Sequence, residues 1–409
     1  MQLRIVFTQF WRDLKAQRLR TALTLFGLAW GTFCVVLLLS FGEGLSRKQI
    51  AAGAAMGERI ILIWGSSTSL PYEGFARGRI IQFEDSDADA IIREVPEVER
   101  ASPEYGITAN LTGPNGKTTI YVSGVRPCFE QMRGIELGVG SRFINEPDEA
   151  GRRRVCVLGS QVKQDLFGDE EAIGRTLEIA GIPFLVVGTM PHKEQDSNYN
   201  GQDDNKAFIP SSAAGAALGL RRPDNLVVEV VDHADGQDVI RQITAVMAKI
   251  HHYDPEDQEA LITWDVGEML AMFRMIFIGF RVFLGVLGVL TLAVAGIGVA
   301  NIMSMVVEDR TSQIGIAMAL GARKRWVLGQ ILMETMLVVA VGGGLGVLFA
   351  SGVVHAAGFL PLEGSMGTPV FSWQIAVLTA ALLGLIGLVS GMGPARRAAN
   401  LNPALALRS

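Results

Sequence analysis

Few residues in this chain have the types and spacing that chemistry requires. The segment Gly113-Pro-Asn-Gly-Lys-Thr118 looks like part of a nucleotide-binding loop. A phosphate-binding loop needs four residues between its two glycines so that backbone amides can surround the phosphates, and only two separate Gly113 from Gly116. Asn115-Gly116 instead favours a β-hairpin turn, because both residues tolerate positive φ. We therefore predict a hairpin here rather than a nucleotide site.

The other candidate ligand sets are incomplete. The segment Asp196-x-Asn198-x-Asn200-Gly201 matches the first half of a calcium loop, but Ala207 stands where the bidentate glutamate is needed. The pair His251-His252 has no further ligands at zinc spacing, and no Gly-x-Ser-x-Gly or comparable nucleophile motif occurs. We expect this chain to bind no metal or cofactor itself and to be non-catalytic.

The elements that carry these residues follow from composition and charge. The 409 residues are 49% hydrophobic and only 19% charged, which excludes a disordered chain and a disulfide-dense scaffold. Residues 21–268 hold 22 Lys/Arg and 36 Asp/Glu, whereas the flanks 1–20 and 269–409 hold 14 and 5. This split predicts membrane segments at both ends and a water-soluble middle.

Four stretches are long and apolar enough to cross a bilayer. They are residues 21–42, 280–307, 334–354 and 373–393. The first contains 22 uncharged residues, too many for the apolar core of a signal peptide, and no cleavage motif follows it. The sequence therefore predicts an α-helical membrane protein with one span, a large outer domain at 43–268, a stalk continuous with the second span at 269–307, and two more spans.

Orientation follows from the distribution of Lys and Arg. Residues 1–20, 308–333 and 394–409 are basic, while the connection 355–372 carries no Lys or Arg. We expect both termini and the 308–333 connection in the cytoplasm and the acidic domain outside. Residues 1–20 have helical amphipathicity, which predicts either a helix along the cytoplasmic leaflet or only a basic flank. Cys128 and Cys156 lie outside, where a disulfide or two free thiols are both open.

Small residues recur four apart in all four spans, a pattern that lets helix backbones approach closely in lipid. The predicted packing positions are Gly27, Gly31, Gly296, Ala300, Gly342, Gly346, Gly387 and Gly391. The spans have no acidic residue in their interior, and Arg281 is expected at an outer end. Such a bundle offers no polar route for a solute.

The outer region shows mixed α/β signals. We expect an α/β frame from residues 43–135 and 222–268, with a β-rich insert at 136–221. Expected helices are 85–95 and 236–250. Expected strands are 59–64, 98–102 (ending at Pro103), 118–122, 154–158, 176–179, 184–187 and 225–231.

Taken in order, several motifs resemble MacB-type and FtsX-like permeases. They are Arg20-Thr-x-Leu-Thr-x-x-Gly27, Gly140-Ser-Arg-Phe143, Arg154-Val-Cys-Val-Leu-Gly159, Asp309-Arg-Thr-x-Gln-Ile-Gly315 and Gly393-Pro-Ala-Arg-Arg-Ala-Ala399. The resemblance implies the membrane subunit of a type VII ABC transporter, with a porter-like frame and a Sabre-like insert. It further implies a dimer, with an identical or paralogous second permease, and a cytoplasmic ATPase that holds ATP and Mg²⁺. Since this chain has no complete phosphate loop, we expect a separate ATPase subunit.

The resemblance also assigns the 308–333 connection to ATPase coupling. We expect Glu308–Trp326 to form one short helix against the ATPase, with Ile314, Ile316 and Met318 in apolar contact. Asp309, Gln313 and Ala317 depart from the family pattern. The predicted coupling residues are Glu308, Asp309, Arg310, Gln313, Ile314, Gly315, Met318, Gly321, Ala322 and Arg323.

The leading functional hypothesis is export from the outer side of the inner membrane by mechanotransmission, with a periplasmic adaptor and an outer-membrane channel as candidate partners. Alternatives are lipoprotein or lipid extraction of the Lol type, FtsX-like control of cell-wall hydrolases, and antimicrobial-peptide sensing. Membrane lipids surround the spans, and no nucleic-acid partner is expected. The acidic outer domain fits either cationic cargo or solubility alone.

Overall fold

The computed structural model describes residues 18–54, 56–193, 199–359 and 368–402. The chain forms two compact units, one from residues 1–48 with 275–409 and one from residues 49–274. Residues 1–17 of the predicted amphipathic segment and residues 196–198 of the calcium half-loop lie outside the described residues, as do 360–367 and 403–409. The two units are described separately.

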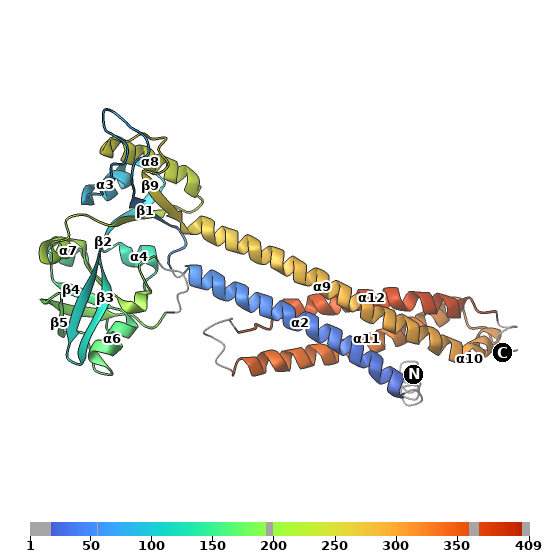
Figure 1. The fold of residues 1–409 in the computed structure, drawn as a ribbon. Coiled ribbons are helices and arrows are strands. Elements are labelled where there is room, and N and C mark those ends of the chain that lie inside the picture. Colours follow the sequence, from blue (N-terminus) through green and yellow to red (C-terminus); the bar gives the residue numbers. More distant parts are fainter. Residues whose placement is uncertain (1–17, 55, 194–198, 360–367, 403–409) are drawn as a thin grey trace. The chain divides into compact units, whose positions relative to one another are not determined.

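The first unit is helical, and its long helices are apolar enough to cross a membrane. They are α2 (Arg18–Ala54), α9 (Val266–Asp309), α11 (Lys324–Ala357) and α12 (Trp373–Ala399) (Figure 1). The 44 residues of α9 span about 66 Å at 1.5 Å each, well beyond the ~30 Å hydrocarbon core. A membrane helix of this length must continue past the bilayer.

The coupling connection differs from the single helix that we predicted over Glu308–Trp326. Helix α9 continues to Asp309, a short α10 (Thr311–Ala319) follows, and α11 begins at Lys324. Between α10 and α11, Gly321 has a φ of +98°, which favours glycine and ends the helix. The early start of α11 places Glu334 ten residues inside a helix.

The frame of the second unit is an antiparallel sheet in the order β2-β8-β1-β9. Its strands are β1 (Ile60–Gly65), the first half of β2 (Val98–Gly113), β8 (Asn225–Val230) and β9 (Leu261–Asp265). Helices α3 (Asp85–Glu94) and α8 (Gly236–His251) share one buried core with the apolar side chains on one face of this sheet (Figure 1).

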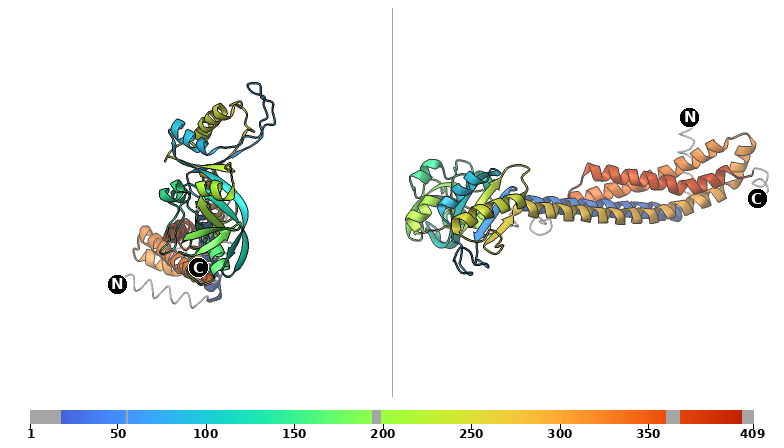
Figure 2. Two further views of the ribbon diagram at one scale, coloured as in Figure 1. Left: turned by 90° about the vertical axis from the view of Figure 1, so that its left-hand side faces the viewer. Right: turned by 90° about the horizontal axis from the view of Figure 1, so that it is seen from above.

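The rest of this unit is a closed six-stranded ring. Strand β2 pairs with both β3 and β5, and the order β3-β7-β4-β6-β5 completes the circle. These strands are β3 (Gly116–Val125), β4 (Val155–Leu158), β5 (Thr176–Ile179), β6 (Ile182–Thr189) and β7 (Lys206–Pro210). The short helices around it are α4 (Phe129–Arg133), α5 (Glu146–Ala150), α6 (Ser160–Phe167), α7 (Ser211–Leu218) and the 3₁₀ turn η1 (Asp203–Asn205). Frame and ring are two lobes of this unit (Figure 2).

One strand, β2, belongs to both lobes. It pairs with β8 through Glu104 and with β3 from Tyr105 onward. We expected a strand ending at Pro103, but β2 runs through this proline to Gly113. In the stretch around Pro103 the described pairing is with β8 alone, so the proline can lie in the strand with its missing N–H on the unpaired side. The ring therefore includes residues 105–125, which the sequence assigned to the frame.

Candidate coupling segment and helix contacts

Helix α10 presents few of the predicted contact residues outward. Ile316 is 47% exposed, and Leu320, directly after the helix, is 85% exposed. Ile314 and Met318 instead pack against the apolar core of the helical unit, and Gly315 is buried. Leu320 and Trp326, which is 52% exposed, add to this exposed apolar surface. The family motif did not indicate that either residue is a contact residue.

The other members of the predicted coupling set also divide into exposed and inward-facing residues. Glu308, Asp309, Gln313, Gly321 and Arg323 are exposed, whereas Ala322 is half-buried. Arg310 turns inward, and its Nη1 donates to both carboxylate oxygens of Glu334 at 3.1 and 3.2 Å. Arg310 therefore binds within the chain. Its partner Glu334, the first residue of the predicted third span, lies ten residues inside α11.

The glycines of α11 make the tightest contacts with α2. A Cβ on Gly346 would lie 2.5 Å from the Ala29 carbonyl oxygen and 2.6 Å from the Thr32 Cβ. A Cβ on Gly342 would lie 2.8 Å from that of Leu28. Only glycine allows this approach, so these two predicted packing positions set how closely α2 and α11 pack.

The remaining predicted packing positions have different partners. A Cβ on Gly296 of α9 would lie 2.6 Å from Ile386 of α12. Added Cβ atoms on Gly387 and Gly391 of α12 would meet Val339 at 3.0 Å and Thr335 at 2.9 Å on α11. Gly31 makes ordinary contacts with α9, Gly27 faces open space, and Ala300 is half-buried. The spacing predicted close contacts, and the structure assigns the partner of each.

A second interhelical ion pair joins α2 to α9. Arg281 Nη2 lies 2.8 Å from Glu43 Oε2 and 3.2 Å from Ser46 Oγ. Glu43 also accepts from Arg47, one turn along α2, at 2.8 Å. We expected Arg281 at the outer end of a span. Its ion-pair partner could not be identified from the sequence, because Glu43 lies on a different helix.

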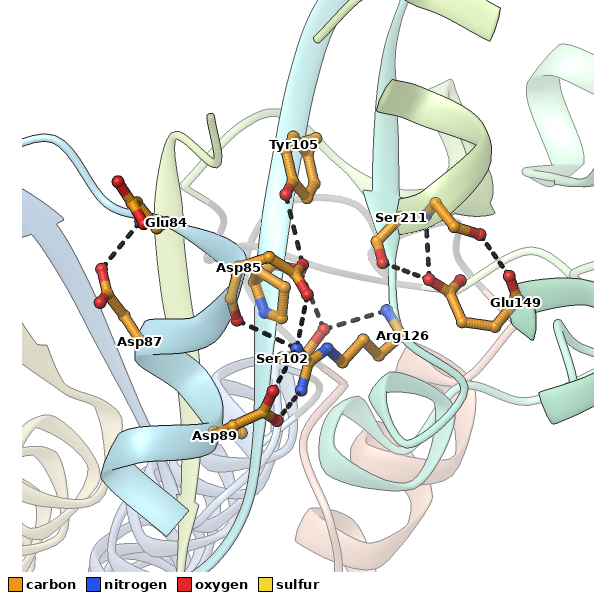
Figure 3. Close-up of polar contacts among 12 residues, drawn as sticks. Glu84, Asp85, Asp87, Asp89, Ser102, Tyr105, Arg126, Glu149 and Ser211 are labelled. Carbon is orange, nitrogen blue, oxygen red and sulfur yellow. Dashed lines mark hydrogen bonds and ion pairs between the residues drawn. The ribbon is translucent and has the colours of Figure 1, made fainter. Parts of the chain in front are cut away.

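In the outer unit, polar contacts bind the ring to the frame. Arg126, which follows β3, donates to Asp85 and Asp89 of α3 at 2.8 and 2.6 Å, as Figure 3 shows. Asp85 also accepts from the hydroxyl of Tyr105, and Ser102 accepts from the Arg126 backbone. Since Asp85 and Asp89 are one helical turn apart, both can face the same guanidinium.

A buried cluster lies at the same crossing of β2. Glu104 is fully buried and accepts hydrogen bonds from Ser123, Tyr199 and Asn225 at 2.7, 2.7 and 3.0 Å. Burial, together with the charge of Glu104, raises the pKa of the Tyr199 hydroxyl well above its ordinary value, so this group stays a donor. Two buried cations balance the acids nearby.

These cations are Arg133 and Lys206. Arg133 donates to Asp203 at 3.1 Å, with its guanidinium 5.1 Å from the Tyr199 ring centroid. Burial lowers the pKa of the Lys206 ammonium, although Glu104 and Asp203 oppose this shift. The opposite charges compensate one another, as buried ions require, and the cluster is best understood as a polar joint between ring and frame.

The sequence motifs that suggested ligands have structural roles in the described residues. Gly113 pairs with Gly116 at the end of the β2–β3 hairpin, so the hairpin is confirmed. Its loop is Pro114-Asn115, one residue earlier than the predicted Asn115-Gly116 turn, and Asn115 has no positive φ. His251 pairs with Asp87 and His252 with Glu73. No group of three metal-ligating side chains occurs in the part of the chain that the structure describes. Cys128 and Cys156 are free.

Comparison with protein families agrees with this architecture. Residues 21–246 match the MacB-like periplasmic core domain, and residues 285–403 match the FtsX-like permease C-terminal domain. The chain belongs to the MacB/FtsX family of ABC transporter permeases. This permease is an inner-membrane protein with four transmembrane helices and an α/β domain outside the cytoplasm.

Relatives cover nearly all of this permease. It is 33% identical over 406 residues to the "Pyoverdine export ATP-binding/permease protein PvdT" of Pseudomonas aeruginosa, and 32% identical over 407 residues to that of Pseudomonas syringae pv. tomato. Each alignment covers 98% of this chain and 58% of the relative, so the chain spans well under two thirds of these relatives' length.

Two solved structures resemble the outer domain. The periplasmic region of MacB from Actinobacillus actinomycetemcomitans matches 54% of this chain and 94% of its own, with 18% identity and a TM-score of 0.42. The extracellular domain of the transporter YknZ from Gram-positive bacteria matches 50% of this chain and 99% of its own, with 14% identity and a TM-score of 0.41.

Proposed function

We propose that this chain is the membrane subunit of a MacB-type exporter that acts as a dimer and is driven by a separate cytoplasmic ATPase. ATP and Mg²⁺ are held by that ATPase, whose closure moves the outer domains and expels a substrate from the outer side of the membrane. The observation that carries the proposal is α9, which is one uninterrupted helix from Val266 to Asp309. A continuous helix is stiff along its axis and can carry displacement from one side of the bilayer to the other.

The proposed orientation places both termini and α10 in the cytoplasm. Basic residues around the described α10–α11 connection, Arg323, Lys324 and Arg325, support this side by the positive-inside rule. The exposed apolar side chains Ile316 and Leu320 then form the surface that contacts the ATPase.

The polarity of the described helices supports transmission rather than conduction. Buried hydroxyls of Thr32, Thr335 and Thr379 donate to carbonyls four residues earlier in their own helices. Glu334 is neutralised by Arg310. These side chains already have a hydrogen-bond or ion-pair partner within the protein, so they do not form a continuous chain of polar groups that a solute could follow through the described spans.

The test starts with purification of the chain from its native membrane, with identification of the chains that accompany it. The complex is then reconstituted into proteoliposomes. We expect a cytoplasmic ATPase to accompany the permease, and ATP-dependent movement of a substrate. Because the relatives are named for pyoverdine export, pyoverdine is the first compound to assay. An unaccompanied permease, or a complex without ATP hydrolysis, would contradict the proposal.

The same experiment separates the alternatives. ATP-dependent release of lipoproteins from the liposomes would favour extraction of the Lol type. A co-purifying cell-wall hydrolase or sensor kinase, without transport, would favour a regulatory role. An adaptor and an outer-membrane channel among the accompanying chains would support export across both membranes.

A further inference from the structure

Helix α9 and the residue after it carry an ion-paired arginine near each membrane border. Arg281 lies in α9, and Arg310 follows its last residue, Asp309. The 29 intervening steps correspond to about 43 Å of helix, which is the thickness of a bilayer with its headgroups. Each arginine can thus lie at one polar border of the membrane, where charge is tolerated.

The two arginines pair with different helices. Arg281 binds Glu43 and Ser46 on α2, at 2.8 and 3.2 Å. Arg310 binds Glu334 on α11, at 3.1 Å. The outer pair is partly open to solvent on its Arg281 side, whereas the inner pair is buried, with side-chain exposures of 15% and 4%.

Ion pairs add a directional constraint to the apolar contacts of α9. In lipid no hydrophobic effect drives helices together, so packing and interhelical polar contacts determine how they associate. A charged pair favours one register, because a shift along the helix axis separates the opposite charges and weakens their attraction. A polar pair therefore fixes the register of two packed helices, much as single polar residues do in coiled coils.

We propose that Arg281–Glu43 and Arg310–Glu334 are register locks at the two ends of the force-transmitting helix. The outer lock makes α2 and α9 move as one body. The inner lock holds the start of α10 against α11, so that ATPase movement reaches α9 without being absorbed at the turn. All four are positioning residues, and their role in transport rests on the proposed function.

The outer lock is the cleaner of the two to test. Arg281→Met leaves Glu43 paired with Arg47, so the acid keeps a partner and the protein should fold. Arg274→Met is the matched control, because Arg274 is an exposed arginine on the same helix with no ion pair to a described residue. The exchange E43R/R281E restores opposite charges across the same two helices.

The first measurement is spin-label distance in the purified complex. Labels replace Leu38 on α2 and Val282 on α9, both exposed, in a chain whose three cysteines are changed to alanine. We expect a narrow distance distribution in the parent and in Arg274→Met, a broad one in Arg281→Met, and recovery in the exchange variant. Equal distributions in all four proteins would overturn the outer lock, whether or not the complex exports anything.

The second measurement is export per ATP hydrolysed. Arg281→Met should keep ATP turnover within about twofold while export falls about tenfold, within the usual range of coupling energies. An unchanged ratio, with a parent that does export, would refute the role in transmission and leave the proposed function intact. A parent without ATP-driven export would instead refute the proposed function.

The inner lock has a different expected phenotype. The variant R310M/E334Q removes both charges, so no buried ion is left unpaired, and ATP turnover of the complex should fall about tenfold. R310K should keep most of the parental ATP turnover, because Arg310 reaches Glu334 through a single nitrogen, which an ammonium can replace. The inner lock would be overturned if R310M/E334Q kept the parental ATP turnover, or if the turnover of R310K were no higher than that of R310M/E334Q.

Discussion

Replacing Gly346 by alanine is expected to push helices α2 and α11 apart. The new methyl would lie 2.5 Å from the Ala29 carbonyl oxygen and 2.6 Å from the Thr32 Cβ. Ordinary carbon contacts begin near 3.5 Å, so both distances are about 1 Å too short. Neither atom can rotate away, because one belongs to the backbone and the other is fixed to it.

The cost follows from overpacking at a rigid contact, which is about 1–3 kcal/mol for an added methyl group. Gly344→Ala is the matched control, because a Cβ on Gly344 meets nothing within 4 Å. Alanine is the better helix former by about 1 kcal/mol, so this control should be neutral or stabilising. The two positions lie two residues apart in one helix, and only Gly346→Ala should lower stability.

The assay is thermal unfolding of the purified full chain in detergent, followed by ATP turnover of the complex. We expect Gly346→Ala to lower the apparent melting temperature and to reduce ATP turnover, and Gly344→Ala to do neither. Equal melting temperatures for the two variants would show that α2 does not lie against this face of α11. The assignment of Gly346 as a helix contact would then be wrong.

Three further changes test other parts of the molecule. Leu320→Asp should leave the melting temperature unchanged and lower ATP turnover about tenfold, because this side chain is 85% exposed; Leu320→Met should retain turnover, and a fully active aspartate variant would remove Leu320 from the coupling surface. Glu104→Ala should cost about 3–5 kcal/mol by leaving buried cations uncompensated, a loss read as a lower melting temperature of the full chain; no loss would contradict a buried cluster. Burial raises the pKa of the Asp265 carboxyl above its ordinary 3.8, so the folded state binds the proton more tightly and stability falls as pH rises from about 3.8 through the raised pKa. Asp265→Asn should therefore gain stability relative to the parent between pH 4 and pH 7, and a constant difference over that range would disprove the shift.

Much of the architecture can be predicted from local sequence. Apolar length locates the four membrane helices, and the starts of α3 and α8 follow from acidic residues near their first turns. The presence of a hairpin between β2 and β3 follows from the turn-forming residues Pro114, Asn115 and Gly116, although its loop lies one residue earlier than predicted. These features depend on neighbours close in the chain, which is the information that composition and spacing contain.

Most of the errors have their cause in contacts between distant residues. Strand β2 continues past Pro103 because β8, more than a hundred residues later, pairs with it there. Ile314 and Met318 turn inward because the helix bundle covers them. A motif match places such residues in a segment without saying which side faces a partner. The helix break at Gly321 has a local cause instead, the positive φ of that glycine.

By itself the sequence determined the membrane spans, the outer domain and the small-residue positions, since each depends on composition or on spacing along one helix. Only the tertiary structure decided which helices those glycines join. It also decided that Glu334 of α11 pairs with Arg310 and that Glu43 of α2 pairs with Arg281. Ion pairs between helices join residues 24 and 238 positions apart. Their energies depend on distance and burial in space, and neither quantity can be calculated from the order of the residues.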